Sequence, residues 1–251
     1  MLNQFSRTEL LFGSEAITRL QNAHVAVFGI GGVGGYTVEA LARSGVGSFD
    51  LIDNDTVALT NLNRQIIATL DTVGQPKVEV MAKRIASINP DANVNCRQCF
   101  FLPANQHEFD FSQYDYVVDA VDTVAAKIAI VLAAKAAGVP VISSMGAGNK
   151  VNPAMFEVAD IYKTKVDPLA RVMRQAMKKN NIKKLKVVYS QELPLLPINE
   201  EIESECHAET SKRRALPGSN AFTPSVAGLI IASEVIKDLV GLDDSHRKGL
   251  A

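Results

Sequence analysis

A glycine-rich turn near the N-terminus constrains the fold of this 251-residue chain more than any other feature. The sequence VAVFG (residues 25–29) has the character of a short buried strand, and IGGVG (residues 30–34) follows it and leads into a helical stretch. Glycine lets the backbone turn tightly and approach a ligand, and the following helix N-terminus offers free N–H groups and a partial positive charge. The pattern favours a phosphate-binding α/β protein, although the glycines alone could also serve only to pack helix against strand.

The alternation of short apolar runs with amphipathic stretches from Ala23 to Ser144 is typical of a parallel sheet wound with helices. We therefore expect a Rossmann-like, doubly wound α/β fold with a mainly parallel sheet and additional C-terminal strands and helices. The expected strands are His24–Gly29, Ser48–Asp53, Asn93–Phe100, Tyr114–Asp119 and Val139–Ser144. The expected helices are Gly32–Arg43, Lys77–Asn89, Thr123–Ala137 and Pro224–Val240, with a hairpin or loop region ending near Ile161.

The composition fits a single α/β domain, because 47% hydrophobic residues can bury a full core over 251 residues. A charged insert at about 161–216 interrupts this domain.

The net charge of −1 excludes a uniformly basic nucleic-acid binder but not a local basic patch. Three cysteines and no recognisable signal peptide predict a cytoplasmic location. The apolar run Val226–Ile236 is too short for a membrane span and is interpreted as a buried helix.

Asp53 stands at the tip of the second expected strand, 19 residues after Gly34. A carboxylate at this place can accept a hydrogen bond from a ribose hydroxyl, which predicts a nucleotide site. Dinucleotide dehydrogenases use the same arrangement, so these residues leave the class of nucleotide open.

Three blocks after the glycine turn narrow the choice: DNDTV (residues 53–57), NLNRQ (residues 61–65) and GQPK (residues 74–77). Arg64 and Lys77 would offset charge on the α-phosphate and the departing pyrophosphate during adenylation, whereas a dehydrogenase has no use for them. Pro76 at a helix start would place Lys77 in the first turn, beside the phosphates. Together the blocks resemble the nucleotide-site signature of the ThiF/MoeB/HesA adenylating family and of the ubiquitin-activating enzymes.

The resemblance implies ATP and Mg²⁺ as cofactors, with Arg64, Lys77 and Asp122 as catalytic residues. Asp122 lies just past a strand end and matches the family aspartate that holds Mg²⁺, whereas we expect Asp119 to be a buried or helix-capping carboxylate. Arg7, in Phe5-Ser6-Arg7, resembles a family arginine that reaches the partner's ATP in a homodimer; it could equally be a surface charge. The expected ATP-binding residues are Gly29, Gly31, Gly32, Gly34, Asp53, Asp55, Asn61, Arg64, Gln65, Lys77 and, in trans, Arg7.

The cysteines weigh against zinc and against thiol chemistry. Cys96 and Cys99 have CxxC spacing, but they fall in an expected strand where they would face opposite sides, and no second CxxC completes four ligands. We expect two small buried side chains and no structural zinc, which many family members that adenylate sulfur-carrier proteins possess. Cys206, beside His207, lies near the family's crossover loop, but nearby glutamates would raise its thiol pKa and argue against catalysis.

Later motifs are similar to the tRNA-modifying branch of the family, which cyclises threonylcarbamoyladenosine beside the anticodon: MGAG (residues 145–148), KTKVDPLAR (residues 163–171) and PGSNAF (residues 217–222). Between Ile161 and Lys186 nine basic residues face one acidic residue, a net charge of +8 that suits tRNA phosphates, although it could be only a solvated helix face. The candidate tRNA contacts are Lys163, Lys165, Arg171, Arg174, Lys178, Lys179, Lys183 and Lys184.

The resemblance implies that the threonyl carboxylate of the modified tRNA attacks the α-phosphate of ATP, after which the neighbouring carbamoyl group closes the ring and releases AMP. The second step is intramolecular and needs no protein nucleophile. Three alternatives stay open at this point. They are adenylation of the C-terminal glycine of a ubiquitin-like sulfur-carrier protein, a non-catalytic nucleotide-binding adaptor for tRNA or a cysteine desulfurase, and a dehydrogenase.

Overall fold

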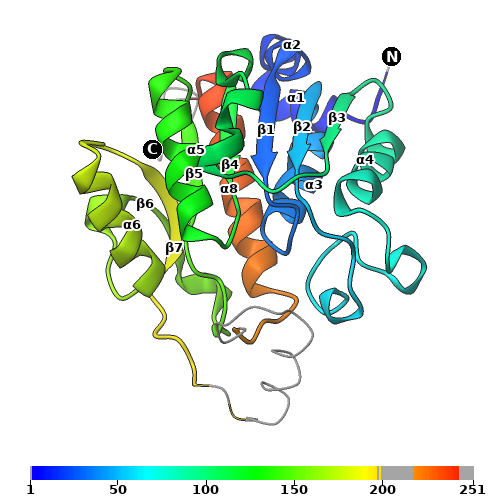
Figure 1. Cartoon of the computed structure of the whole chain (residues 1–251). Coiled ribbons are helices and arrows are strands. Elements are labelled where there is room, and N and C mark those ends of the chain that lie inside the picture. The colour runs from blue at the N-terminus through cyan, green and yellow to red at the C-terminus, as the bar shows by residue number, and fades with distance from the viewer. Residues whose placement is uncertain (1, 197, 199–216, 243–251) are drawn as a thin grey trace, which may run out of the picture.

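A seven-stranded sheet runs through the centre of the computed structural model, which describes residues 2–196, 198 and 217–242 (Figure 1). Its strand order is β3-β2-β1-β4-β5-β7-β6. All neighbouring pairs are parallel except β6 and β7, which are antiparallel. The strands are β1 His24–Phe28, β2 Ser48–Ile52, β3 Asn93–Arg97, β4 Tyr116–Asp119, β5 Val141–Ser144, β6 Phe156–Asp160 and β7 Lys186–Ser190.

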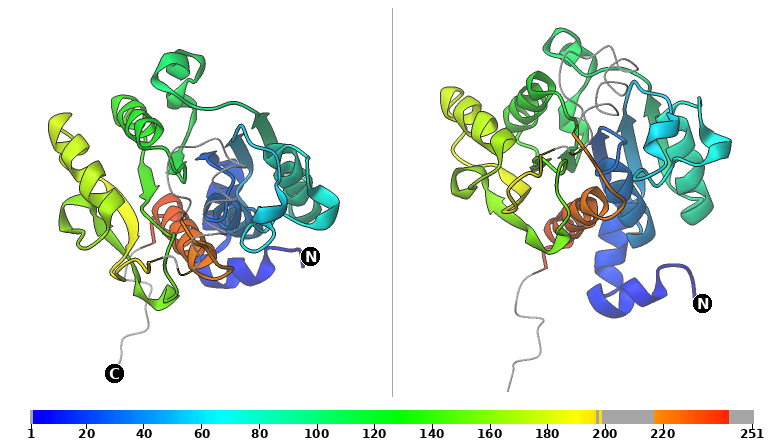
Figure 2. Two further views of the ribbon diagram at one scale, coloured as in Figure 1. Left: turned by 60° about the horizontal axis from the view of Figure 1, so that its bottom comes forward. Right: turned by 90° about the horizontal axis from the view of Figure 1, so that it is seen from below.

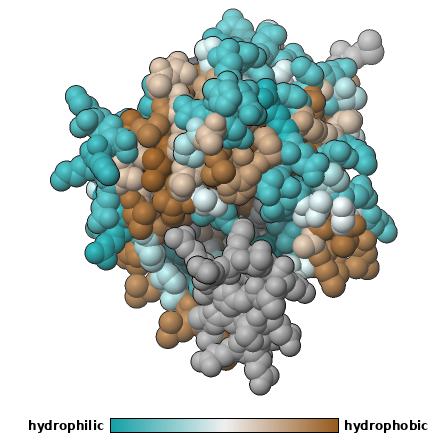
Figure 3. Space-filling model, viewed as in Figure 1, coloured by the Kyte–Doolittle hydropathy of each residue, from teal (hydrophilic) through white to brown (hydrophobic). Residues whose placement is uncertain are grey.

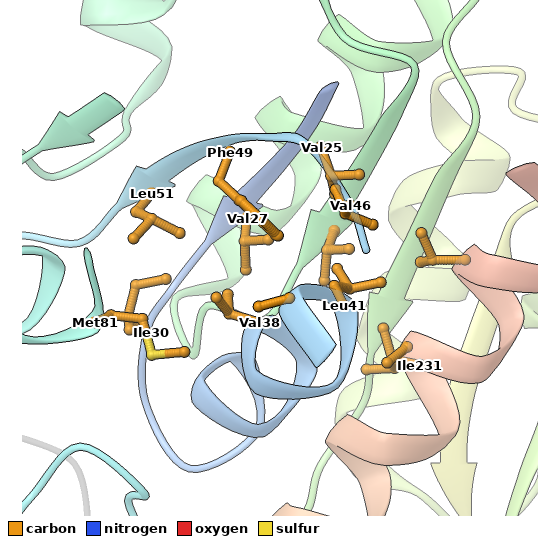
Figure 4. Close-up of a cluster of buried hydrophobic side chains, with 14 of the residues drawn as sticks. Val25, Val27, Ile30, Val38, Leu41, Val46, Phe49, Leu51, Met81 and Ile231 are labelled. Atoms are coloured by element: carbon orange, nitrogen blue, oxygen red, sulfur yellow. The ribbon is translucent and has the colours of Figure 1, made fainter. Parts of the chain in front are cut away.

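Helices cover both faces of this sheet, because its central strands are apolar on both sides. Val25 and Val27 of β1 pack in one core with α3, α4 and α8 (Figure 4), whereas Ala26 and Phe28 face a second core with α5 and α6. Figure 2 shows the two helical layers on opposite sides. The α-helices are α1 Ser6–Phe12, α2 Ser14–Asn22, α3 Gly34–Ser44, α4 Lys77–Ile88, α5 Val124–Ala136, α6 Pro168–Lys179 and α8 Thr223–Val240.

Within the described residues, six short 3₁₀ segments lie in the connections, and they carry several of the motifs. They are η1 Leu59–Asn61, η2 Leu70–Thr72, η3 Pro103–Glu108, η4 Phe111–Gln113, η5 Pro153–Met155 and η6 Ile161–Lys163. None of the helices in the described ranges combines the length and apolarity that crossing a membrane would require.

The α/β fold and its mainly parallel sheet confirm the expectation, but three local predictions differ from the structure. Strand β3 ends at Arg97, three residues early, because the chain leaves the sheet so that Phe101 can pack on Phe28. Cys96 on this edge strand is exposed and Cys99 is half-buried, so the expected burial fails for Cys96. The region ending near Ile161 contains β6, whose partner β7 lies beyond α6, and such a non-local pairing leaves no mark on the local sequence.

A buried carboxylate ties α3 to α4. The side chain of Glu39 is 8% exposed and accepts hydrogen bonds from Arg84 Nε at 2.6 Å and Arg43 Nε at 2.8 Å. Burial alone would raise the pKa of this carboxyl, but the two arginines outweigh it and the pKa lies below its ordinary value. The ionised carboxylate therefore stabilises the folded state.

We expect Glu39→Gln to lower the free energy of unfolding at pH 7 by about 1–3 kcal/mol, because it removes the buried negative charge that Arg84 and Arg43 bind. This difference is fully present above the ordinary carboxyl pKa of 4.5 and is lost as the pH falls through the lower pKa of the folded state. Urea unfolding between pH 7 and pH 3 measures it. Glu9→Gln, at an exposed position of α1, is the matched control. A destabilisation that stays equally large at pH 3 would contradict the assignment.

Candidate active site

The glycine turn and the predicted nucleotide-site aspartates gather at the carboxyl edge of the sheet, at the lower end of Figure 1. The glycine turn follows β1, Asp53 follows β2 and Asp122 lies just past β4. The chain winds outward from β1 through β2 to β3 and then resumes on the other side with β4. Open α/β sheets bind ligands at such a reversal of strand order.

The glycines of the turn serve different purposes. Gly29 has a φ of +88°, and a Cβ on it would lie 2.7 Å from the carbonyl oxygen of Ala120, whereas a Cβ on Gly34 would lie 1.8 Å from the carbonyl oxygen of Gly29. These two glycines allow the turn to pack against the end of β4. Among the described residues, a Cβ on Gly31 would instead meet only Gln65 Nε2, at 3.9 Å, and one on Gly32 would touch Pro224 at 3.1 Å. No neighbour in the described part of the chain therefore requires glycine at position 31, and the open space there could admit a ligand.

Asp53 holds the glycine turn in place. Its Oδ2 accepts the Ile30 N–H at 2.6 Å and its Oδ1 accepts the Asp55 N–H at 2.9 Å. Burial raises the pKa of the Asp53 carboxyl, and the nearby Lys77 ammonium only partly opposes this. The carboxylate that the sequence assigned to a ribose hydroxyl thus also fixes the backbone of the turn.

The two expected cations are held by groups of the chain itself. The Lys77 side chain is 6% exposed and its Nζ lies 2.8 Å from Oδ2 of Asp55, which is 52% exposed. Arg64 Nη1 donates to the Thr60 carbonyl at 2.8 Å and to Asn63 Oδ1 at 3.0 Å. Burial lowers the pKa of the Arg64 guanidinium. Its Cγ would lie 3.5 Å from a Cβ on Gly32, so the side chain runs along the glycine turn.

Gln65 and Asn61 are buried beside these cations. Gln65 is 6% exposed, and its Oε1 is the one buried side-chain oxygen or nitrogen in the described part of the chain without a hydrogen-bond partner. A buried acceptor without a partner costs free energy unless a ligand or water supplies a donor. Asn61 is 8% exposed and its Oδ1 accepts the Ala58 N–H at 3.1 Å, which fixes the loop that carries Arg64 and Gln65.

Beyond β4 lie two aspartates in different settings. Asp119 is fully buried, as the sequence predicted, and its Oδ2 lies 3.0 Å from Nζ of the equally buried Lys127. Asp122 is exposed at the carboxyl edge and accepts a hydrogen bond from Thr123 Oγ1 at 3.2 Å. Lys127 is a buried residue of this site that was not predicted from the sequence. Its signal was a lone cation on the first turn of an otherwise apolar stretch, VAAKIAIVLAA (residues 124–134).

The later motifs meet the nucleotide motifs in space. Asn63 Nδ2 donates to the Ser219 carbonyl at 3.0 Å, and Asn220 Nδ2 donates to the Lys150 carbonyl at 2.7 Å. The Asn149 N–H donates to the Gly218 carbonyl at 2.8 Å. Residues 217–222 therefore bridge the NLNRQ loop and the loop after β5, so three motifs distant in sequence form one wall at the carboxyl edge.

The basic residues of 161–186 divide between the two edges of the sheet. Lys163, Lys165, Arg171, Lys178, Lys179, Lys183 and Lys184 are exposed. Arg174 is half-buried and donates to the Thr164 carbonyl at 2.7 Å, so its guanidinium ties α6 to the preceding loop. The start of α6 contacts the loop after β5 through Asp167, whereas Lys184 precedes β7 and so lies at the amino edge. Figure 3 shows hydrophilic side chains along the margin where α6 lies.

Two candidates lie outside this assembly. Arg7 is exposed on α1, next to Phe5, whose ring lies beside Gly45 at the end of α3. This is the amino edge, so the chain does not bring its own Arg7 to the glycine turn. Cys206 lies outside the described residues.

The comparison with protein families agrees with this geometry. Residues 5–250 match the ThiF family. The chain belongs to the ThiF family. The resemblance inferred from the sequence is thereby confirmed, and the mainly parallel sheet with helices on both faces agrees with the fold of the related structures.

Individual relatives of this ThiF-family chain are similar over most of its length. The tRNA threonylcarbamoyladenosine dehydratase of Bacillus subtilis (strain 168) is 47% identical over 244 residues, 96% of each chain. Crystal structures of the E. coli dehydratase TcdA match with a TM-score of 0.84. The AMP complex is 33% identical and covers 95% of this chain and 94% of TcdA; the ATP complex is 34% identical and covers 98% and 96%. The adenylyltransferase and sulfurtransferase uba4 of Ogataea parapolymorpha is 36% identical but covers only 54% of this chain and 34% of that protein.

The contrast between Gly31 and Gly34 can be tested. We expect Gly31→Ala to raise the Kd for ATP at least about tenfold, because a methyl group would stand where phosphates approach, and to leave the melting temperature within about 2 °C. Gly34→Ala should instead destabilise the fold by about 1–3 kcal/mol or more, since its methyl group collides with backbone. Isothermal titration calorimetry and thermal unfolding separate the two effects. Unchanged ATP affinity in Gly31→Ala would show that phosphates do not approach this glycine.

Proposed function

We propose that this chain is an ATP-dependent tRNA threonylcarbamoyladenosine dehydratase. The observation that carries the proposal is the 47% identity to the Bacillus subtilis dehydratase over 96% of both chains. The ATP complex of the related E. coli enzyme supports ATP as the co-substrate. The glycine turn, Asp53, Arg64 and Lys77 supply the groups that adenylation needs at one edge of the sheet. The sulfur-carrier alternative is less favoured, because the relative that combines adenylyl and sulfur transfer aligns with only 54% of this chain.

The reaction joins two displacements. A carboxylate oxygen of the threonyl group attacks the α-phosphorus of ATP, and the bond to pyrophosphate breaks. The carbamoyl group of the same nucleoside then attacks the activated carboxyl carbon, loses a proton and expels AMP, which carries away the former carboxylate oxygen. The net change is loss of one water from the nucleoside at the expense of ATP. Because both reacting groups belong to one nucleoside, ring closure is intramolecular and requires no protein nucleophile.

The cationic and the hydrogen-bonding residues of the site have different proposed roles in this reaction. Lys77 and Arg64 neutralise the charge that develops at the α-phosphate and on pyrophosphate. When ATP binds, the Lys77 ammonium leaves the Asp55 carboxylate and binds a phosphate instead. Because the Asp55 carboxylate is exposed, water readily solvates it after this exchange. Asp53 accepts from the ribose, and Gln65 presents a buried acceptor that a hydroxyl or amino group satisfies.

Asp122 fits a magnesium ion held mainly by phosphates. Asp122 is an exposed carboxylate at the carboxyl edge. The described residues contain no group of three or more His, Cys, Asp or Glu side chains that could hold a metal ion by themselves. Mg²⁺ usually keeps several waters and binds through one or two carboxylates plus substrate phosphates. When bound it would offset phosphate charge and orient the triphosphate.

The positions of the basic residues bear on two proposed partners, tRNA and a second copy of the chain. The exposed lysines and Arg171 of 161–186 are proposed to bind the phosphates of tRNA carrying threonylcarbamoyladenosine. Since Arg7 lies at the amino edge of its own chain, it can serve an ATP site only in a second copy, which supports a homodimer. A tRNA substrate fits a cytoplasmic location, and a cysteine desulfurase or a sulfur-acceptor protein is a proposed additional partner.

Mass spectrometry of anticodon-loop nucleosides tests the function. We expect cells that lack this protein to lose the cyclic nucleoside and to regain it with the wild-type chain but not with Lys77→Met. In the purified enzyme Lys77→Met should lower kcat about 10²–10³-fold, the cost of removing one group that stabilises transition-state charge. An unchanged cyclic nucleoside in the deletion strain would refute the assignment. Full complementation by Lys77→Met would point to a non-catalytic adaptor, and pyrophosphate exchange only with a sulfur-carrier protein would establish the alternative enzyme.

The tRNA surface is tested by its salt dependence. Each phosphate contact removed should lower the slope of log Kd against log salt by about 1, so Arg171→Ala combined with Lys178→Ala should lower it by about 2. Lys237→Ala, on α8, is the control and should leave the slope unchanged. Fluorescence anisotropy with modified tRNA measures both. Equal slopes for all three proteins would exclude α6 from the interface.

A further inference from the structure

The first turn of α5 contains a lysine that neither substrate could touch. The Lys127 side chain is 0% exposed, and so is its partner Asp119. The rest of this turn and the two turns after it are apolar, and Ala129, Ile130 and Val131 are buried in the core between the sheet and α5. A charge in such surroundings calls for a reason.

Stability does not supply that reason. Moving two charges out of water costs much of what their attraction returns, and well-packed apolar side chains can replace a buried ion pair without loss. An apolar residue at position 127 would also suit the composition of α5. The explanation for the buried pair therefore lies in the backbone groups that Lys127 and Asp119 bind.

The ammonium group of Lys127 is bound to the backbone of the turn after β4. Lys127 Nζ donates to the Val121 carbonyl at 3.1 Å and lies 3.0 Å from Asp119 Oδ2. The other oxygen of Asp119 accepts the Val121 N–H at 3.3 Å, and Ser143 Oγ donates to Oδ2. Both polar backbone groups of Val121 are thus held by this one ion pair.

Val121 is the residue between two parts of the active site. On one side of it, Ala120 packs so closely on the glycine turn that a Cβ at Gly29 would lie 2.7 Å from its carbonyl oxygen. On the other side stands Asp122, the residue proposed to hold Mg²⁺. Any rotation of the peptide units at Val121 would move the Asp122 carboxylate relative to the glycine turn.

We propose that Lys127 is a positioning residue: through its ion pair with Asp119 it fixes the backbone of Val121 and so sets Asp122 at the distance from the glycine turn that a metal-bound triphosphate requires. The proposal rests on the proposed function for the role of Asp122, but the rigidity of the turn can be measured without activity.

The double variant Lys127→Met/Asp119→Asn tests this, because it removes both charges together, whereas Lys127→Met alone strands a buried carboxylate. Hydrogen exchange by NMR in the free protein should become at least about tenfold faster at the amides of Val121 and Asp122 and stay unchanged in β1 and β2. Binding of Mn²⁺ in the presence of α,β-methylene ATP, followed by electron paramagnetic resonance, should weaken about 10- to 100-fold, the usual effect of losing a group behind a metal ligand. The kcat should fall with the metal affinity, with little change in the KM for ATP.

Glu39→Gln is the matched control, since it disrupts a buried ion pair between α3 and α4 and should leave metal binding and exchange at Val121 unaltered. A folded double variant with wild-type exchange at the turn and wild-type Mn²⁺ affinity would overturn the proposal. The proposed function fails by a different result, a wild-type protein that forms no AMP with modified tRNA, and the exchange measurement would still decide the role of Lys127. If the double variant does not fold, Lys127→Leu/Asp119→Ala, which also removes both charges and the side-chain contacts to the Val121 backbone, is measured in its place with the same two outcomes.

Discussion

The active site depends on a contact between two backbones at the carboxyl ends of β1 and β4. Gly29 and Gly34 lack side chains where the turn meets itself and Ala120, and added Cβ atoms would lie 1.8–2.7 Å from carbonyl oxygens. This contact brings the glycine turn, Asp53 and the Asp122 turn to one edge. Gly31 in the same motif differs, because within the described residues a Cβ there would meet only Gln65 Nε2, at 3.9 Å.

Around this contact the charged side chains are paired with other groups of the same chain in the absence of nucleotide. Lys77 pairs with Asp55, Arg64 donates to a carbonyl and an amide, and Asp53 accepts two backbone N–H groups. Such pairing keeps the side chains near their working positions at little reorganisation cost, which is how preorganised charge stabilises a transition state. Gln65 is the exception, because its buried Oε1 has no partner within the described residues. That acceptor is the feature of the free protein that most directly calls for a ligand.

The wall at the carboxyl edge is assembled from segments far apart in the chain. Residues 217–222 connect the NLNRQ loop with the loop after β5, and the first turn of α6 is held to that loop by Asp167. The basic surface begins there and continues to the amino edge with Lys178 to Lys184. A nucleic acid bound along α6 would therefore span the height of the sheet, with one end beside the nucleotide site. Arg174 belongs to the same basic segment, but its guanidinium binds the Thr164 carbonyl and so holds α6 in place.

The sequence by itself determined the α/β alternation, most helix and strand bounds, the family and the nucleotide motifs, because each of these is written in local periodicity or in contiguous residues. Only the tertiary structure decided which glycine packs and which leaves space, that β6 pairs with β7 across α6, that Cys96 is exposed at a sheet edge, and that Lys127 lies under the Asp122 turn. These features depend on contacts between residues distant in the chain, and such contacts are fixed by the packing of layers, which no local pattern encodes.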